Sequence, residues 1–249
     1  GTTLTCGTLG VIVKDRDNMI ILVDYDNIDR SITRHGISHV VNRILSKIDP
    51  HEVLGNRHVH LRLYGGWYEQ NRFTTRAQNL SADLSASFPN VCLLSDNATS
   101  VIVNCEMAYS ILADPSNHLF NTYRSRGIPS GLKAKHPRNC GCTNQSCPLI
   151  AAYDFINNNL CNTCGNVKPE DLFFRGEQKL VDTMLTSDLI FSSTQSLNLG
   201  VVSSDDDFWP GIKTTLVNGK NVIQIHTKNR STPSFYTRTT SANYIQKQL

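Results

Sequence analysis

The chain has 249 residues, which suits one α/β domain carrying an insertion. Apolar residues make up 39% of it and the mean hydropathy is -0.27, as in soluble globular proteins. No run approaches the roughly 18 apolar residues needed to span a bilayer, and the first residues lack the pattern of a signal peptide. We therefore expect a soluble, intracellular protein (cytoplasmic or nuclear) with no membrane partner.

The distribution of charge says more than its total. A net charge of +3 and a pI near 8.4 are too weakly basic to indicate nucleic acid. Between Pro115 and Tyr153, however, there is no Asp or Glu. A polyanion such as RNA could bind the basic residues there, although a solvated basic loop explains the same charges. These basic residues are Arg124, Arg126, Lys133, Lys135 and Arg138.

Hydrophobic patterning predicts strands that alternate with helices. Residues 19–23 form a continuous apolar run, typical of a strand buried on both faces. The polar tail after Lys228 has no clear assignment. The expected elements in chain order are a strand at 19–23, a helix near 40–48, a strand at 58–64, a helix near 72–88, strand-like segments at 91–94 and 100–112, a helix at 177–189, a strand at 199–203, a helix at 208–217 and a strand at 222–225.

This alternation favours a mostly parallel sheet with helices on both faces. Residues 115–170 interrupt it, because they are rich in Gly, Pro, Asn and Cys and poor in apolar periodicity. We expect residues 1–249 to form a single domain in which 115–170 is an inserted module. In such sheets ligands bind at the carboxyl ends of the strands.

Acidic residues follow two of the expected strands and lie on one helix. Any one of them is more simply explained as a helix cap. Acids supplied by three elements to one edge of a sheet indicate instead a site for a hard divalent cation, because clustered carboxylates repel each other without one. These residues are Asp24 and Asp26, then Asp182 and Asp188, then Asp205, Asp206 and Asp207.

Three segments resemble the motifs of NYN domains, a branch of the PIN-like nuclease superfamily. The segment 20–27 (ILVDYDN after Ile20) resembles the opening motif, and 179–182 (KLVD), with Asp188 six residues on, resembles the central helix. Segment 201–208 (VVSSDDDF) resembles the late signature of Ser, Asp, Asp and Phe. The three come in the family's order and cover most of the chain outside 115–170.

The resemblance implies a Rossmann-like sheet and an endoribonuclease that depends on Mg²⁺ or Mn²⁺. It implies RNA as the substrate and a homo-oligomer as the assembly. In its terms Asn27 supports the first acid, Ser203 orients an acid or contacts phosphate, and Lys179, one turn before the central acid, meets a carboxylate or the scissile phosphate. The metal-binding acids would be Asp24, Asp182, Asp205 and Asp207.

Asp26, Asp188 and Asp206 are secondary candidates for the same site. The sequence departs from the family pattern at Ser204, where glycine is usual, and at Asp206, where serine is usual. Both changes leave the fine geometry of the metal site open. The first strand and central helix are also farther apart than in compact members.

Five of the eight cysteines crowd into one stretch and predict a structural zinc site. Two halves about a dozen residues apart match the spacing of a tetrahedral site, and four of the five suffice. A zinc closed by four thiolates has no open position, so we expect it to be structural. The five are Cys140, Cys142, Cys147, Cys161 and Cys164.

Two other functions compete with the nuclease. Asp24 and Asp26 form an Asp-x-Asp pair similar to the start of haloacid-dehalogenase-like phosphatases, but Ile28 stands where those enzymes prefer threonine or valine. A non-catalytic RNA-binding scaffold on the same fold is the other alternative. No Gly-x-Gly-x-x-Gly or P-loop pattern occurs, so we expect no nucleotide cofactor.

Overall fold

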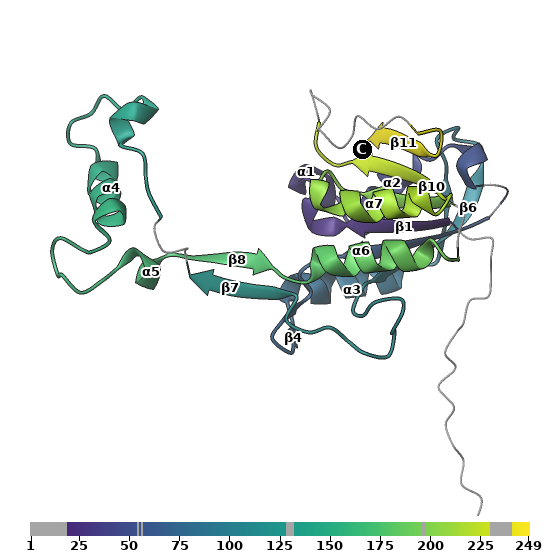
Figure 1. Ribbon diagram of the computed structural model, residues 1–249, viewed down its shortest axis with the longest axis horizontal. Coiled ribbons are helices and arrows are strands. Elements are labelled where there is room, and N and C mark those ends of the chain that lie inside the picture. The colour runs from purple at the N-terminus through teal and green to yellow at the C-terminus, as the bar shows by residue number, and fades with distance from the viewer. Residues whose placement is uncertain (1–18, 54, 56, 128–131, 196–197, 230–240) are drawn as a thin grey trace, which may run out of the picture. The chain divides into compact units, whose positions relative to one another are not determined.

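The computed structural model describes residues 19–53, 55, 57–127, 132–195, 198–229 and 241–249 (Figure 1). The protein is a mixed α/β protein whose chain forms two compact units. The first unit comprises residues 1–65, 75–119 and 180–249, and the second comprises 66–74 and 120–179. The larger segment of the second unit, 120–179, begins and ends later than the expected insert at 115–170. The unit also contains the short earlier segment 66–74.

A largely parallel sheet forms the centre of the first unit. All neighbouring strands are parallel except β5, which is antiparallel to β6. This confirms the mostly parallel sheet expected from the apolar runs, which are buried on both faces. The seven strands, in spatial order, are β11 (Tyr244–Gln248), β10 (Asn221–His226), β9 (Asn198–Val202), β1 (Met19–Asp24), β2 (His58–Tyr64), β6 (Ser100–Met107) and β5 (Asn90–Leu93).

The strand order reverses direction between β1 and β9. From β1 the chain moves to β2 and β6 on one side, and later to β9, β10 and β11 on the other. The register aligns Val23 with Leu63 on one neighbour and with Val202 on the other. The carboxyl ends of β1 and β9 are therefore adjacent at a topological switch point, where α/β sheets bind their ligands.

Helices pack on the faces of this sheet, as Figure 1 shows. α6 (Val181–Ser192) and α7 (Trp209–Val217) contact each other, and α6 contacts β1 and β2 while α7 contacts β10. α2 (Ile37–Leu45) and α3 (Thr75–Ser87) also contact each other and reach β5 and β6, whereas the short α1 (Arg30–Thr33) precedes α2. Most of these helices begin at the carboxyl edge of the sheet and run back along its faces.

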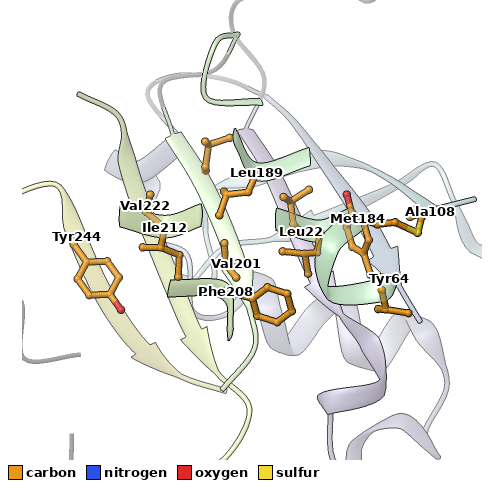
Figure 2. Close-up of a cluster of buried hydrophobic side chains, with 13 residues drawn as sticks. Leu22, Tyr64, Ala108, Met184, Leu189, Val201, Phe208, Ile212, Val222 and Tyr244 are labelled. Atoms are coloured by element: carbon orange, nitrogen blue, oxygen red, sulfur yellow. The ribbon is translucent and has the colours of Figure 1, made fainter. Parts of the chain in front are cut away.

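The core between α6, α7 and the sheet fixes the turns that follow the strands. Leu22 of β1 and Val201 of β9 lie in one cluster with Met184 and Leu189 of α6 (Figure 2). Phe208, just after β9, is fully buried in this cluster. Burying an aromatic ring of this size contributes on the order of 2–3 kcal/mol, so the acidic turn before Phe208 is held against the core.

The second unit is built around a small four-stranded sheet. Its order is β4 (Arg72–Phe73), β3 (Tyr68–Glu69), β7 (Tyr123–Gly127) and β8 (Phe174–Gln178). A Cβ atom at Gly66 would lie 3.0 Å from Tyr123 Cδ2, and one at Gly176 would lie 2.0 Å from Tyr123 Oη. Glycine at both positions therefore lets the ring pack against the backbone.

The rest of the second unit has almost no core. It contains the 3-10 helix η3 (Pro137–Cys140), α4 (Pro148–Asn158) and α5 (Pro169–Leu172). Among the described residues from 123 to 179, only Pro137 and Pro169 are buried, and α4 buries none of its residues. A segment with so little burial needs another source of order, such as a metal or a partner.

Three segments differ from expectation. The strand-like segment expected at 100–112 ends at Met107. The helix expected at 177–189 begins at Val181, because Glu177 belongs to β8, where it pairs with Arg124. Leu180 precedes α6 with a φ of 67° and is not helical. The tail left without assignment contains β11, which pairs in parallel with β10. In the described part of the chain, no helix is long and apolar enough to cross a membrane.

Candidate metal centre

The first acid of the site closes β1 and is tied to β9. Asp24 is 4% exposed, and its Oδ2 accepts a hydrogen bond of 2.9 Å from Ser203 Oγ. Ser203 Oγ in turn accepts one of 3.0 Å from the backbone N–H of Asp205. Ser203, fully buried directly after β9, therefore links the two strand ends and orients Asp24.

Burial makes the ionised form of Asp24 costly. The pKa of this carboxyl is raised to about 7, mainly by burial, although the hydrogen bond from Ser203 lowers it. The neighbouring carboxylates of Asp182, Asp26 and Asp205 raise it further. A carboxylate held in this way gains stability from a cation placed among these acids.

The turn after β9 supplies two more of the predicted acids. Asp205 caps the 3-10 helix η4 (Asp206–Phe208) by accepting a 3.0 Å hydrogen bond from the N–H of Asp207 through Oδ1. One carboxylate oxygen of Asp205 is thus used as a cap. Asp205 and Asp206 are partly buried, whereas Asp207 is exposed.

Asp182 joins them from the first turn of α6. The pKa of its carboxyl is raised by burial and then by the carboxylates of Asp205 and Asp207. The four acids predicted for the metal, Asp24, Asp182, Asp205 and Asp207, therefore come from three elements to the carboxyl edge of β1 and β9.

Neutral side chains support this edge from behind. Asn27 Oδ1 accepts a 3.4 Å hydrogen bond from the N–H of Ser204 and another from Thr227 Oγ1. Ser204 Oγ accepts a 2.9 Å hydrogen bond from the N–H of Lys228. Ser204, which stands where the NYN pattern has glycine, thus has a structural partner, and Asn27 holds the loop after β1 to the loop after β9.

Sequence reasoning missed one further part of this support. Gln224 Nε2 donates a 3.1 Å hydrogen bond to the carbonyl oxygen of Ser203, and Tyr244 Oη donates to Gln224 Oε1. Gln224 lies between Ile223 and Ile225 in β10 and is 3% exposed. A polar residue between apolar strand residues can be noticed in the sequence, but its hydrogen-bond partner cannot be predicted from it.

The donor set suits a hard divalent cation. All four acids offer carboxylate oxygens, the ligands that Mg²⁺ and Mn²⁺ accept. Among the described residues, no three of these acids bring oxygens within 4.8 Å of one another. An ion held here would therefore keep waters between itself and some of the acids, as Mg²⁺ usually does in proteins.

Asp188, a secondary candidate, lies in a different network. It is fully buried and accepts hydrogen bonds from Arg62 Nε at 3.2 Å, from Tyr64 Oη and from the N–H of Leu112 at 2.6 Å. Arg62 also contacts Glu106. Burial raises the pKa of Asp188, but each of these partners stabilises its ionised form. The structure therefore gives Asp188 a packing role between α6 and β2.

Asp26, another secondary candidate, is paired with a cation. It lies in the 3-10 helix η1 (Tyr25–Asn27) directly after β1, and Arg76 of α3 forms an ion pair with it. The Arg76 guanidinium also lies over the Tyr25 ring, 5.1 Å from its centroid. The charge of Asp26 is thus paired with that of Arg76.

The predicted basic residues all lie in the second unit, as does Lys179. Arg124 and Arg126 of β7 form ion pairs with Glu177 of β8, at 3.0 Å and 3.4 Å. Lys179 is exposed and precedes α6, so it is not one helical turn before Asp182 as expected. Lys133, Lys135 and Arg138 are exposed.

The five cysteines are not gathered at one point. Cys147 caps the start of α4 and Cys161 follows its end, so the two halves are separated by a helix of 11 residues, or about 16 Å. Among the described residues, no three of these sulfurs lie within 4.8 Å of one another. The structure therefore does not form the single four-thiolate site that the spacing predicts.

One half of that site does have the expected local geometry. The N–H of Gly165 donates a 2.9 Å hydrogen bond to the carbonyl oxygen of Cys161, and Gly165 has a φ of 67°. The backbone N–H groups of Cys164 and Thr163 point at the Cys161 sulfur and lower the pKa of its thiol. This turn favours the thiolate form that binds metals.

The described residues contain one tight group of potential ligands, at Asp49, His51 and Glu52. Lys247 Nζ already lies 2.8 Å from Asp49 and 2.7 Å from Glu52. An ammonium group therefore neutralises these carboxylates, and we assign them to the attachment of β11.

Comparisons with family models, with curated proteins and with solved structures found no significant match to this chain.

Proposed function

We propose that the protein is a metal-dependent endoribonuclease of the PIN-like type, with a Rossmann-like catalytic domain. The observation that carries the proposal is the meeting of Asp24, Asp182, Asp205 and Asp207 at the switch point of the sheet. The similarity of the segments around these acids to NYN motifs supports it independently of the geometry. RNA is proposed as the substrate because that family mostly cuts RNA.

In this proposal the four acids hold Mg²⁺ or Mn²⁺. A bound ion of this kind lowers the pKa of a coordinated water and stabilises charge on a phosphodiester. The protein's own contribution is positional. Ser203 holds Asp24 through a 2.9 Å hydrogen bond, and Phe208 fixes the turn that carries Asp205 and Asp207 against the core.

The test is cleavage of end-labelled single-stranded RNA, hairpin RNA, transfer RNA and single-stranded DNA by purified protein in Mn²⁺ or Mg²⁺. Hydrolysis by a metal-activated water does not use the 2′-hydroxyl as nucleophile. An RNA with a single 2′-deoxy substitution at the cut should therefore still be cleaved there. Cleavage that needs this hydroxyl and persists in EDTA would instead identify a metal-independent ribonuclease. RNA binding without cutting would favour the scaffold alternative.

We also propose that the second unit binds zinc through Cys161 and Cys164. A closed tetrahedral site needs two further ligands. Cys140, Cys142 and Cys147 are the candidates, and because Cys147 stands at the other end of α4, this proposal requires the segment to rearrange around the metal. The support is the turn around Cys161 and the scarcity of buried residues, since metal binding can supply the free energy of folding that a core does not.

Zinc content measured on the purified protein tests this second proposal. We expect about one zinc per chain, and its loss in Cys161→Ser because a hydroxyl is a poor ligand for zinc. Asn162→Ser, an exposed change in the same turn, serves as the matched control and should keep the metal. Zinc-free wild-type protein, or equal zinc in both variants, would refute the assignment.

A further inference from the structure

Arg76 is a cation held in one orientation beside the acidic edge. It is the second residue of α3, and its Nη1 pairs with Asp26 Oδ1. Its guanidinium lies over the Tyr25 ring at 5.1 Å from the centroid. The side chain nevertheless remains 53% exposed, whereas Asp26 is only 11% exposed. The little-exposed carboxylate and the buried ring thus support a side chain that remains about half exposed.

The support of Arg76 belongs to the loop that carries the first metal-binding acid. Tyr25 and Asp26 follow Asp24 without a break, in η1 at the carboxyl end of β1. α3 begins at this same edge, as its contact with η1 through Arg76 requires. Arg76 is therefore a cation of the first unit that contacts the loop directly after Asp24.

An acidic site that acts on RNA has to hold a polyanion against carboxylates. The metal neutralises part of this charge, but the phosphates next to the scissile one also have to be bound. A guanidinium has five N–H donors in a planar fork, so it can bind a carboxylate on one side and a phosphate on another. Because Asp26 and Tyr25 already orient it, little rotamer entropy is lost on binding.

We propose that Arg76 binds a backbone phosphate of the RNA beside the acidic site and that Asp26 is its positioning residue. The proposal rests on the nuclease function proposed above and names how that site holds its substrate. It also gives Asp26 a role separate from metal binding. Arg76 has no local signal in the sequence, because it stands as a lone arginine in a polar helix.

The experiment is RNA binding as a function of salt, by fluorescence anisotropy with labelled single-stranded RNA in Mn²⁺. All proteins carry Asp205→Asn, so that the RNA is not cut. Each phosphate contact with single-stranded nucleic acid contributes about 0.7 to the slope of log affinity against log salt concentration. Arg76→Ala should therefore reduce the slope by about 0.7 and weaken binding by about tenfold.

Two variants separate charge, geometry and position. Arg76→Lys keeps the charge but not the fork, so it should keep the slope and lose part of the affinity. Arg43→Ala removes an exposed arginine from the last turn of α2, at the opposite edge of the sheet, and should change neither. If Arg76→Ala melts early, Arg76→Gln, which can still hydrogen-bond to Asp26, replaces it.

A slope and an affinity for Arg76→Ala equal to those of Arg43→Ala would overturn the assignment. This readout does not depend on catalysis. If the wild-type protein cuts no RNA but Arg76→Ala lowers the slope, the nuclease proposal fails and the phosphate contact stands. If the wild-type protein cuts RNA and Arg76→Ala leaves the slope unchanged, the nuclease proposal stands and the phosphate contact fails.

Discussion

Replacing Asp188 with alanine is expected to lower the free energy of unfolding by about 3–5 kcal/mol. The change removes a fully buried carboxylate and leaves the largely buried guanidinium of Arg62 with one anionic partner fewer. It also strips the Tyr64 hydroxyl and the Leu112 N–H of their acceptor. Buried donors left without a partner cost about 1–3 kcal/mol each, which accounts for the size of the effect.

Asp182→Ala is the matched control, because both aspartates lie on α6. They are six residues apart, which at about 100° per residue places them on different sides of the helix. The ionised form of Asp182 is opposed by desolvation and by the carboxylates of Asp205 and Asp207. Its removal should leave metal-free stability unchanged or raise it, while cleavage is lost. Urea denaturation of both variants in EDTA would show the difference, and equal losses of stability would contradict the division of roles.

Replacing Asp24 with asparagine is expected to stabilise the metal-free protein above pH 7. In the folded chain the pKa of Asp24 is about 7, compared with 3.8 for a free side chain. Between these values the unfolded chain loses its proton first, so the wild type loses stability as pH rises from about 4 to about 7. Asparagine does not titrate, so the stability difference between variant and wild type should grow across this window and stay constant above it.

The expected size follows from the shift in pKa. Three units of pKa correspond to about 4 kcal/mol, an upper limit, because the hydrogen bond from Ser203 is weaker to an amide. A gain of about 2 kcal/mol would raise the melting temperature by about 4–8 °C. Asp83→Asn, an exposed change on α3, should alter it little at any pH.

Added Mn²⁺ should make the wild type more stable than Asp24→Asn. A ligand that binds only the folded chain stabilises it by about 2.7 kcal/mol at a hundred times its dissociation constant. The wild type should gain this stabilisation, and Asp24→Asn should gain much less. A variant that melts below the wild type in EDTA at pH 8 would show that Asp24 stabilises the fold and would remove the reason for a cation there.

Local pattern was enough to predict the strands that carry the acids. The apolar runs of β1 and β9 are buried on both faces, so their ends and the aspartates after them were visible in the sequence. The order of the strands was not visible, because it depends on pairings between distant segments. Only the structure shows that β1 and β9 are neighbours and that Ser203 reaches Asp24.

Errors arose where distant pairing overrides a local pattern. Glu177 belongs to a strand because β8 pairs with β7, some fifty residues earlier in the chain. β11 was missed because Tyr244 is its only buried residue, and exposed and partly buried residues alternate in the rest of the strand. The zinc site that the cysteine spacing predicts stays a prediction, with α4 between its two halves. The pairing of Arg76 with Asp26 was not visible either, because Arg76 is a lone arginine in a polar helix.

The most direct test of the central claim is RNA cleavage by the wild type and by Asp205→Asn, each in Mn²⁺ and in EDTA. The amide oxygen of asparagine can still accept the hydrogen bond from the N–H of Asp207, so the turn should stay folded. We predict cleavage by the wild type in Mn²⁺ only, and a loss of at least about 100-fold in the variant. Cleavage that survives in EDTA, or that is equal in the two proteins, would contradict a metal site built from these aspartates.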